Sequence, residues 1–405
     1  MGQHGSCVSI LFSGTLVASS IALHTLLTRI LPVDVVFYAP AITWGFTCLC
    51  LQKAISHAYT LMLMAHFILA SACYWKLGTS NAVLNRVLLY PLVGSVMALV
   101  SARYLPAVPS HGMAAVALLQ GWSIVGWFLM AVVFPASIIS SIEPQEVRGK
   151  RLENFMRQPD GRRVESLTVP SSNGVNLDVV VVQTEEETDR WIIYFGGNAE
   201  MIEDTVEEMS GLTEIVRGNW VFYNPRGVGR SSGYAAEVRD LVDDAVHVVR
   251  HVSSRYSIPP KKLLLWGHSI GGGIAAAVVR RECMESPLLL DRTFSSLSDA
   301  AVAFSPLYAT LTRLLIRYTT GDLDVVADCK MAARNKKLVI YHRMDEVIAY
   351  DVASLGRKDV LRELRVKEGM VVELHGARVQ SPHNSLLSAF EERMTLCRCV
   401  SELFR

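Results

Sequence analysis

A serine at position 269 has the surroundings that nucleophilic chemistry requires. Glycines lie two residues before and two residues after it, in the order Gly267-His268-Ser269-Ile270-Gly271, directly after the apolar run 263–266. Glycines at these two places allow a sharp turn from strand to helix, because a Cβ atom there would collide with the neighbouring backbone. We therefore expect Ser269 to lie in a strained, exposed turn and to attack a carbonyl carbon.

Such a serine needs a general base, and the base needs a carboxylate that orients it. Both residue types occur where later expected strands end: Asp345 follows the apolar run 338–341, and His383 follows the run 370–374. The chain order serine, acid, histidine is one in which such triads occur. We predict Ser269 as nucleophile, His383 as general base and Asp345 as the orienting acid.

Two residues compete for these roles. Glu346 adjoins Asp345 and could serve as the acid instead. His375 could serve as the base, but it ends the last expected strand rather than lying in the loop beyond it, so we prefer His383.

Backbone N–H groups that stabilise an oxyanion are expected at two places. One is the N–H of Ile270, the residue after the serine. The other is the N–H of Asn198, with Ala199 as the second choice, in a loop that follows the expected strand 191–195 and begins with two glycines. The residues expected to contact the substrate are Gly196, Gly197 and His268.

The elements that position these residues are short apolar strands alternating with helical patterns, and Asn-Gly at 173–174 predicts a hairpin between the first two strands. This alternation predicts an α/β fold with a mostly parallel sheet, a leading hairpin and helices on both faces. The expected strands are 163–169, 175–183, 191–195, 220–223, 263–266, 288–291, 338–341 and 370–374, and the clearest helices are 236–254 and 272–283.

The region after the sixth expected strand, Phe294–Met331, is the only candidate for a lid. Its residues 307–318 have apolar side chains at helical spacing. We interpret this stretch as a core helix rather than as a hydrophobic lid.

The composition divides the 405-residue chain in two. Asp34 is the only acidic residue before Glu143, and long apolar runs dominate that part, whereas the later part mixes charged and apolar residues. We expect a transmembrane helical region at 1–142, a linker at 143–163 and a soluble domain at 164–405. The net charge of +1 and the lack of a basic stripe argue against nucleic acid as a partner.

About five membrane spans are expected from apolar length alone. The excess of Lys and Arg in alternate loops places the soluble domain in the cytoplasm, and one span more or fewer would reverse this orientation. A cleaved signal peptide is an alternative for the first span, although residues 1–4 lack a positive charge. The expected spans are 7–27, 35–51, 58–75, 87–102 and 113–139.

No metal or cofactor is expected. His247 and His251 are four residues apart on an expected helix but lack the glutamate of a zinc-binding H-E-x-x-H. A glycine-rich turn at 227–233 has its third glycine one place too late for a dinucleotide fingerprint. The eight cysteines are scattered and suggest neither a disulfide framework nor zinc ligands.

From residue 163 onward the chain resembles the α/β-hydrolase superfamily. The resemblance rests on three successive motifs: Tyr194-Phe195-Gly196-Gly197-Asn198-Ala199, the turn 224–233, and the serine motif. The first motif is similar to the H-G-N-A oxyanion loop of membrane-associated serine hydrolases, some of which are lysophospholipases or protein depalmitoylases, but has Gly196 in place of the histidine. The resemblance implies a hydrolase fold behind the transmembrane region.

Together these features predict a membrane-anchored serine hydrolase that cleaves an acyl ester or thioester, with a lipid or lipidated substrate. A serine peptidase or amidase is one alternative. A catalytically inactive hydrolase fold that serves as a membrane-tethered interaction module is the other, because a fold does not guarantee activity.

Overall fold

The computed structural model describes residues 162–405 and scattered positions between 129 and 153. The residues omitted within 162–405 are 206–211, 214–215, 283, 306, 333, 376–378 and 380. The chain divides into two units, Met1–Phe128 and Leu129–Arg405. The first four expected spans and much of the fifth therefore lie outside the described residues. Within the described part of the chain, no helix is both long and apolar enough to cross a membrane.

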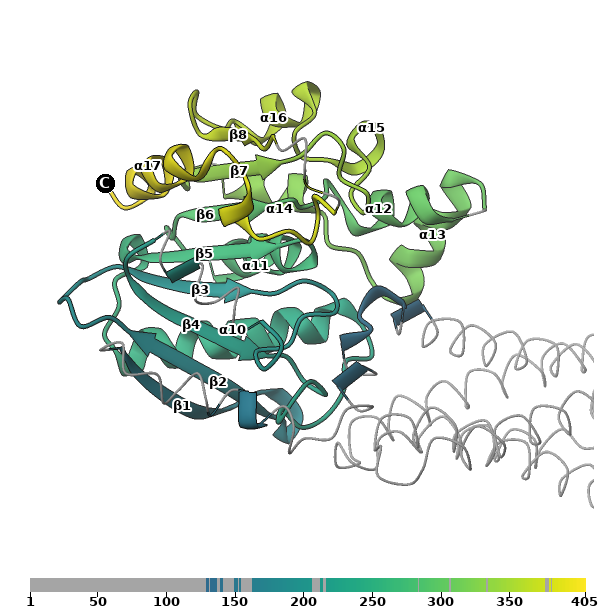
Figure 1. Ribbon diagram of the computed structural model, residues 1–405. Helices are drawn as coiled ribbons and strands as arrows, with labels where there is room; N and C mark the ends of the chain where they lie inside the picture. The colour runs from purple at the N-terminus through teal and green to yellow at the C-terminus, as the bar shows by residue number, and fades with distance from the viewer. Residues whose placement is uncertain are drawn as a thin grey trace, which may run out of the picture. The chain divides into compact units, whose positions relative to one another are not determined.

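An eight-stranded sheet forms the centre of the second unit (Figure 1). Its spatial order is β1-β2-β4-β3-β5-β6-β7-β8, so that β3 and β4 exchange places relative to the chain. The strands are β1 (Arg163–Pro170), β2 (Asn176–Gln183), β3 (Trp191–Phe195), β4 (Asn219–Asn224), β5 (Leu263–His268), β6 (Leu288–Asp291), β7 (Lys337–Tyr341) and β8 (Val371–Glu373).

The expected leading hairpin is confirmed, because β1 pairs with β2 in antiparallel register. At its turn Asn173 and Gly174 both have positive φ, 59° and 73°, and the Val175 N–H donates to the Ser172 carbonyl at 3.3 Å. Two consecutive positive φ angles are what a tight hairpin turn requires, and Asn-Gly tolerates them. β2 also pairs antiparallel with β4, and the remaining strand pairs are parallel, which confirms the α/β-hydrolase fold with a mostly parallel sheet.

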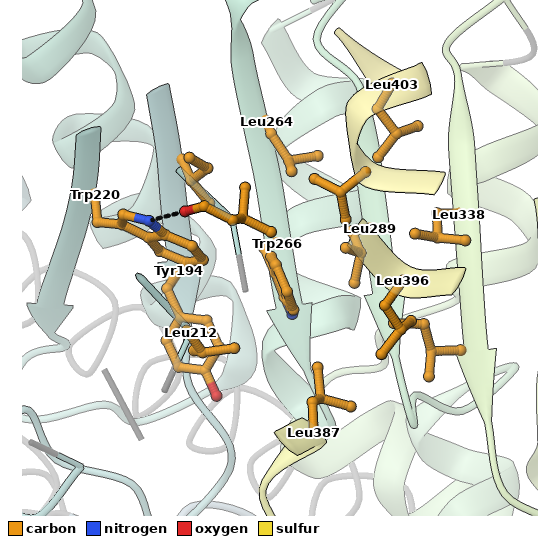
Figure 2. Close-up of a cluster of buried hydrophobic side chains, with 14 of the residues drawn as sticks. Tyr194, Leu212, Trp220, Leu264, Trp266, Leu289, Leu338, Leu387, Leu396 and Leu403 are labelled. Carbon is orange, nitrogen blue, oxygen red and sulfur yellow. Dashed lines mark hydrogen bonds between the residues drawn. The ribbon is translucent and has the colours of Figure 1, made fainter. Parts of the chain in front are cut away.

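Helices cover both faces of the sheet (Figure 1). On one face α10, α11, α14 and α16 pack in succession. On the other face α17 and the segment that includes Leu212 and Val216 close an apolar cluster over the central strands. Figure 2 shows Leu396 and Leu403 of α17 over Leu289 and Leu338. The helices are α10 (Val238–Arg255), α11 (Ile270–Glu282), α12 (Leu297–Phe304), α13 (Ala309–Thr319), α14 (Val325–Met331), α15 (Tyr350–Ala353), α16 (Lys358–Leu364) and α17 (Arg393–Leu403).

This cluster packs against β5, the strand that directly precedes Ser269. Leu264 and Trp266 of β5 lie in the cluster, and Trp220 beside them donates its indole N–H to the Val216 carbonyl at 3.1 Å (Figure 2). Because buried apolar side chains are closely packed, the end of β5 can move little.

The prediction of a core helix at 307–318 is wrong. A helix forms there as α13, but only Thr312 and Ile316 within it are buried. Leu311 and Leu314 are each 44% exposed. Helical spacing reveals that apolar side chains share one face, but it does not tell whether that face meets the core or the surroundings.

The described residues between 129 and 140, which we call the entry segment, pack against the rest of this unit. The described backbone is not helical at Phe134 and Pro135. Proline has no N–H to donate to the helix, and it disfavours the helical conformation of the residue before it. Met130, Phe134 and Ala136 are buried. The Ala136 N–H donates to the Asn198 carbonyl at 3.1 Å, and the Ser140 hydroxyl accepts from the Gly229 N–H at 2.7 Å. The described end of the fifth expected span is therefore part of the α/β unit.

Candidate active site

Ser269 lies between the end of β5 and the start of α11, in a turn that only glycine neighbours permit. Its φ is +53°, in the left-handed region that a non-glycine residue seldom adopts. A Cβ added to Gly267 would lie 2.3 Å from the Gly271 carbonyl oxygen, and one added to Gly271 would lie 1.9 Å from the Phe195 carbonyl oxygen. Both contacts are impossible for real atoms, so the two glycines are needed for close approach of the backbone segments.

Hydrogen bonds from the neighbouring strand hold this turn. The Ser269 N–H donates to the Asp291 carbonyl at 3.0 Å, and the Thr293 hydroxyl donates to the Ser269 carbonyl at 2.9 Å. The left-handed conformation costs a non-glycine residue about 1–3 kcal/mol of folding free energy, and it persists only where the surrounding structure holds the residue in place. The strain is thus offset by contacts at the end of β6.

Ser269, His383 and Asp345 form one hydrogen-bonded chain, and all three are buried. The distance from His383 Nε2 to Ser269 Oγ is 3.0 Å, and that from His383 Nδ1 to Asp345 Oδ2 is 2.9 Å. The other oxygen of Asp345 accepts the backbone N–H groups of Val347 and Ile348 at 2.9 and 2.6 Å. The carboxylate therefore has a fixed orientation, and an imidazole held in this way can accept a proton from the serine hydroxyl.

The two competing residues lie elsewhere. Glu346 accepts the backbone N–H of His383 at 3.1 Å and the hydroxyl of Ser381, so it supports the loop and not the imidazole ring. Burial acts to raise the pKa of Glu346, but these hydrogen bonds hold the pKa below its ordinary value. His375 is exposed and pairs with Glu392 at 2.8 Å. Neither residue has a hydrogen bond to Ser269 or to the ring of His383 among those found in the described part of the chain.

The two expected oxyanion donors belong to different elements. Ile270 is the first residue of α11, so its N–H has no acceptor in a preceding helical turn, and the helix dipole places partial positive charge there. Asn198 lies in the loop after β3, and its carbonyl accepts from the Ala136 N–H. This bond fixes the peptide plane between Asn198 and Ala199. That these N–H groups receive an oxyanion stays a prediction.

The expected substrate contacts Gly196 and Gly197 border a hydrogen-bonded pair that the sequence reasoning missed, in which His268 is buried and Glu200 is partly buried. A Cβ on either glycine would come within 2.9 Å of a Glu200 carboxylate oxygen. Glu200 accepts from His268 Nδ1 at 2.6 Å, and it also accepts the Tyr194 hydroxyl at 3.1 Å. The carboxylate thus fills the space beneath the loop.

His268 was expected to contact the substrate, but both of its ring nitrogens are engaged within the protein. Nδ1 bonds Glu200, and Nε2 bonds the His383 carbonyl at 3.0 Å. Both partners are acceptors, so a doubly protonated ring satisfies them best. Burial acts to lower the pKa of His268, but the charge and hydrogen bond of Glu200 outweigh it and raise the pKa to about 9. Both ring nitrogens of His268 are therefore engaged within the protein, and the ring joins the loop after β3 to the loop that contains His383.

Arg292 is the second residue that the sequence reasoning missed. It is buried with φ +45°, and it forms two hydrogen bonds to the Asp291 carboxylate at 2.8 and 3.0 Å. The same guanidinium donates to the carbonyls of Pro382 and Ser385 at 2.8 and 2.7 Å. Burial acts to raise the pKa of Asp291, but the Arg292 charge keeps the pKa below its usual value. The pair therefore ties the loop that contains His383 to the end of β6.

A comparison with protein families matches residues 215–352 to a family described as Hydrolase_4, serine aminopeptidase, S33. This stretch includes Ser269 and Asp345 and ends before His383. Two curated relatives are the α/β-hydrolase domain-containing protein WAV2 of Arabidopsis thaliana and the lysophosphatidylserine lipase ABHD12 of Danio rerio.

The identities to these relatives are 28% over 41% of this chain for WAV2 and 29% over 32% of this chain for ABHD12. The matched part spans 58% and 35% of the two relatives' own lengths, so each shares only a part with this chain. Among solved structures, an α-β hydrolase from Vibrio vulnificus aligns with a TM-score of 0.53 at 18% identity, over 68% of this chain and 92% of that chain. This last likeness concerns the fold.

Proposed function

This chain belongs to the α/β-hydrolase superfamily, and from that premise we propose that it is a membrane-anchored serine hydrolase that cleaves an acyl ester or thioester. The observation that carries the proposal is the buried hydrogen-bonded chain Ser269–His383–Asp345, at a turn that strains the serine backbone.

The proposed reaction has two acyl-transfer steps. Ser269 Oγ forms a bond to the substrate carbonyl carbon while its proton passes to His383 Nε2, and the carbonyl oxygen takes the negative charge. The N–H groups of Ile270 and Asn198 are the proposed donors to that oxyanion. The bond to the alkoxide or thiolate then breaks, His383 returns the proton to the leaving group, and water releases the acyl group from Ser269 by the same sequence.

A lipid or lipidated substrate is supported by two observations. The curated relative ABHD12 is named a lysophosphatidylserine lipase. The sequence before Glu143 has the apolar length of about five membrane spans, and we propose that the transmembrane region predicted at 1–142 ends before the entry segment, followed by a linker at 143–163 and a cytoplasmic hydrolase domain at 164–405. A serine peptidase is the second candidate, because the matching family is described as a serine aminopeptidase.

The test is labelling of the detergent-solubilised full chain with a fluorophosphonate probe, which reacts only with activated serines. We expect labelling of the wild type and none of Ser269→Ala or His383→Ala. Ser253→Ala is the matched control, because the Ser253 hydroxyl is buried in α10 without a hydrogen-bond partner among the described residues. A folded wild type without labelling would identify an inactive interaction module. Labelling that survives Ser269→Ala would show that another residue is the nucleophile.

Substrate class follows from a second measurement on the same proteins. Long-chain acyl esters, acyl-cysteine thioesters and aminoacyl amides are compared by kcat/KM in mixed micelles. A higher kcat/KM for the amides than for the esters and the thioesters would show that the protein is a serine peptidase and not an esterase.

A further inference from the structure

Five exposed apolar side chains lie on the surface at the end of α12, in its connection to α13, and in the first half of α13. We call this surface the cap stripe. The exposed fractions are 88% for Tyr308, 64% for Phe304 and 46% for Leu307. The full set is Phe304, Leu307, Tyr308, Leu311 and Leu314.

The stripe has the geometry of an interfacial helix. Leu311 and Leu314 of α13 are three residues apart, which places their side chains on one face of the helix, and Leu307 and Tyr308 directly precede that helix. The buried residues of α13, Thr312 and Ile316, lie on a different face. One face of α13 therefore packs on the protein, and a second face exposes apolar side chains. A surface helix of a soluble protein exposes polar residues on its outward face instead.

The stripe lies at the edge of the sheet where Ser269 lies. α12 begins six residues after β6 ends, and the carboxyl ends of the parallel strands share that edge. The entry segment is bonded at the same edge, through Ala136 to Asn198 and Ser140 to Gly229. Figure 1 shows α12 and α13 at this edge, together with the described pieces of the entry segment in dark blue.

The sequence before the entry segment is 128 residues of mainly apolar composition, and it joins the described unit at Leu129. A chain that leaves a bilayer at this point enters the protein beside the active site. The bilayer surface is then the apolar medium nearest to the cap stripe.

We infer that the cap stripe inserts into the interface of the lipid bilayer beside the active site and delivers acyl chains from the membrane to Ser269. The inference rests on the membrane placement in the proposed function. An amphipathic helix of this kind buries its apolar face about 5–10 Å into the boundary between headgroups and acyl chains. Arg313 and Arg317 keep about half of their side-chain surface exposed beside the stripe, where they meet anionic headgroups while paired with Asp299 and Asp322.

The occupant of the stripe is identified by photo-crosslinking. The photoreactive residue p-benzoylphenylalanine is placed at Tyr308 in the full chain, which is reconstituted into vesicles of phosphatidylcholine with a minor share of phosphatidylserine. We expect a lipid adduct on the peptide that contains position 308. The control places the same residue at Met394 on α17, which is 78% exposed, and we expect no lipid adduct there. A crosslinked dimer, a crosslink to residues 1–128, or no adduct at position 308 would overturn the inference.

A kinetic comparison tests delivery separately from chemistry. Tyr308→Glu combined with Leu311→Glu is compared with Met394→Glu. The stripe variant is expected to hydrolyse a long-chain ester resident in vesicles about tenfold more slowly, because charged side chains resist burial at the interface. Hydrolysis of a short soluble ester is expected to stay within about twofold of the wild type, since the triad is untouched.

The two proposals fail in different ways. The stripe variant could lose equal activity on both esters, or lose no activity on the ester in vesicles. Either result would overturn the delivery of acyl chains by the cap stripe. A wild type that hydrolyses neither ester, yet forms the lipid adduct at position 308, would overturn the proposed hydrolase and retain the membrane contact.

Discussion

Replacement of Asp345 by asparagine is the sharpest test of the proposed triad, because the structure dictates how the new amide must sit. Oδ1 of Asp345 accepts two backbone N–H groups, from Val347 and Ile348. An asparagine that turned its NH₂ group toward them would lose both hydrogen bonds, each of which contributes about 1 kcal/mol, and would bring donors together. The amide oxygen therefore stays there, and the NH₂ group faces His383 Nδ1.

A donor at that position forces the wrong form of the imidazole. Nδ1 of His383 must then accept, so the proton lies on Nε2, the nitrogen that is 3.0 Å from Ser269 Oγ. A nitrogen that carries a proton cannot accept one from the serine. The same exchange in a serine protease triad lowers kcat by about 10⁴-fold, which corresponds to about 5 kcal/mol in the barrier.

The assay is the second-order rate constant for fluorophosphonate labelling of Ser269, which requires no knowledge of the substrate. We expect Asp345→Asn to label about 10⁴-fold more slowly than the wild type, with a thermal midpoint close to that of the wild type. Glu346→Gln is the matched control, and we expect a change of less than about tenfold because Glu346 bonds the loop backbone and not the imidazole. A normal rate for Asp345→Asn, or an equal loss for Glu346→Gln, would refute the assignment of the acid.

Three further outcomes concern the supports of the site. Gly271→Ala places a Cβ 1.9 Å from a backbone oxygen of β3, so we expect loss of folded protein, measured as a fall in soluble yield and thermal midpoint beside the milder Gly369→Ala. Arg292→Leu leaves the buried Asp291 carboxylate without its partner, and urea unfolding is expected to show a loss of about 3–5 kcal/mol; a loss below about 1 kcal/mol would contradict the buried pair. The pKa of His268 rises from 6.5 to about 9 on folding, so its contribution to stability is complete below pH 6.5 and is lost as the pH rises through about 9. Urea unfolding of the wild type should weaken by about 3 kcal/mol across that window, and His268→Gln should remove this slope.

Sequence reasoning located the strands closely because each is a short apolar run flanked by polar or glycine residues. The expected strand 263–266 was observed as Leu263–His268, and the expected strand 191–195 was observed with the same ends. It also placed Ser269, Asp345 and His383 after the strands observed as β5, β7 and β8, and the structure brings these side chains into one hydrogen-bonded chain. Their catalytic roles stay predictions.

The missed features depend on contacts between distant parts of the chain. Glu200 and His268 are 68 residues apart, and Arg292 reaches carbonyls 90 and 93 residues further on. Periodicity describes one element at a time, so it gave no sign of these pairs. The charged Asp291-Arg292 pair directly after a run of three leucines was the one local signal, since burial of two charges requires a reason.

The docking of the entry segment affects where the chain can be shortened for study in solution. A chain that begins at Glu143 keeps the whole sheet and all three residues of the proposed triad. It loses the N–H that orients the Asn198 carbonyl and the hydroxyl that receives the Gly229 N–H. Kinetic constants from such a fragment would describe a protein in which the loop after β3 has lost its hydrogen bond to the entry segment. A fragment that begins at Leu129 retains both contacts, so the useful cut precedes the charged linker.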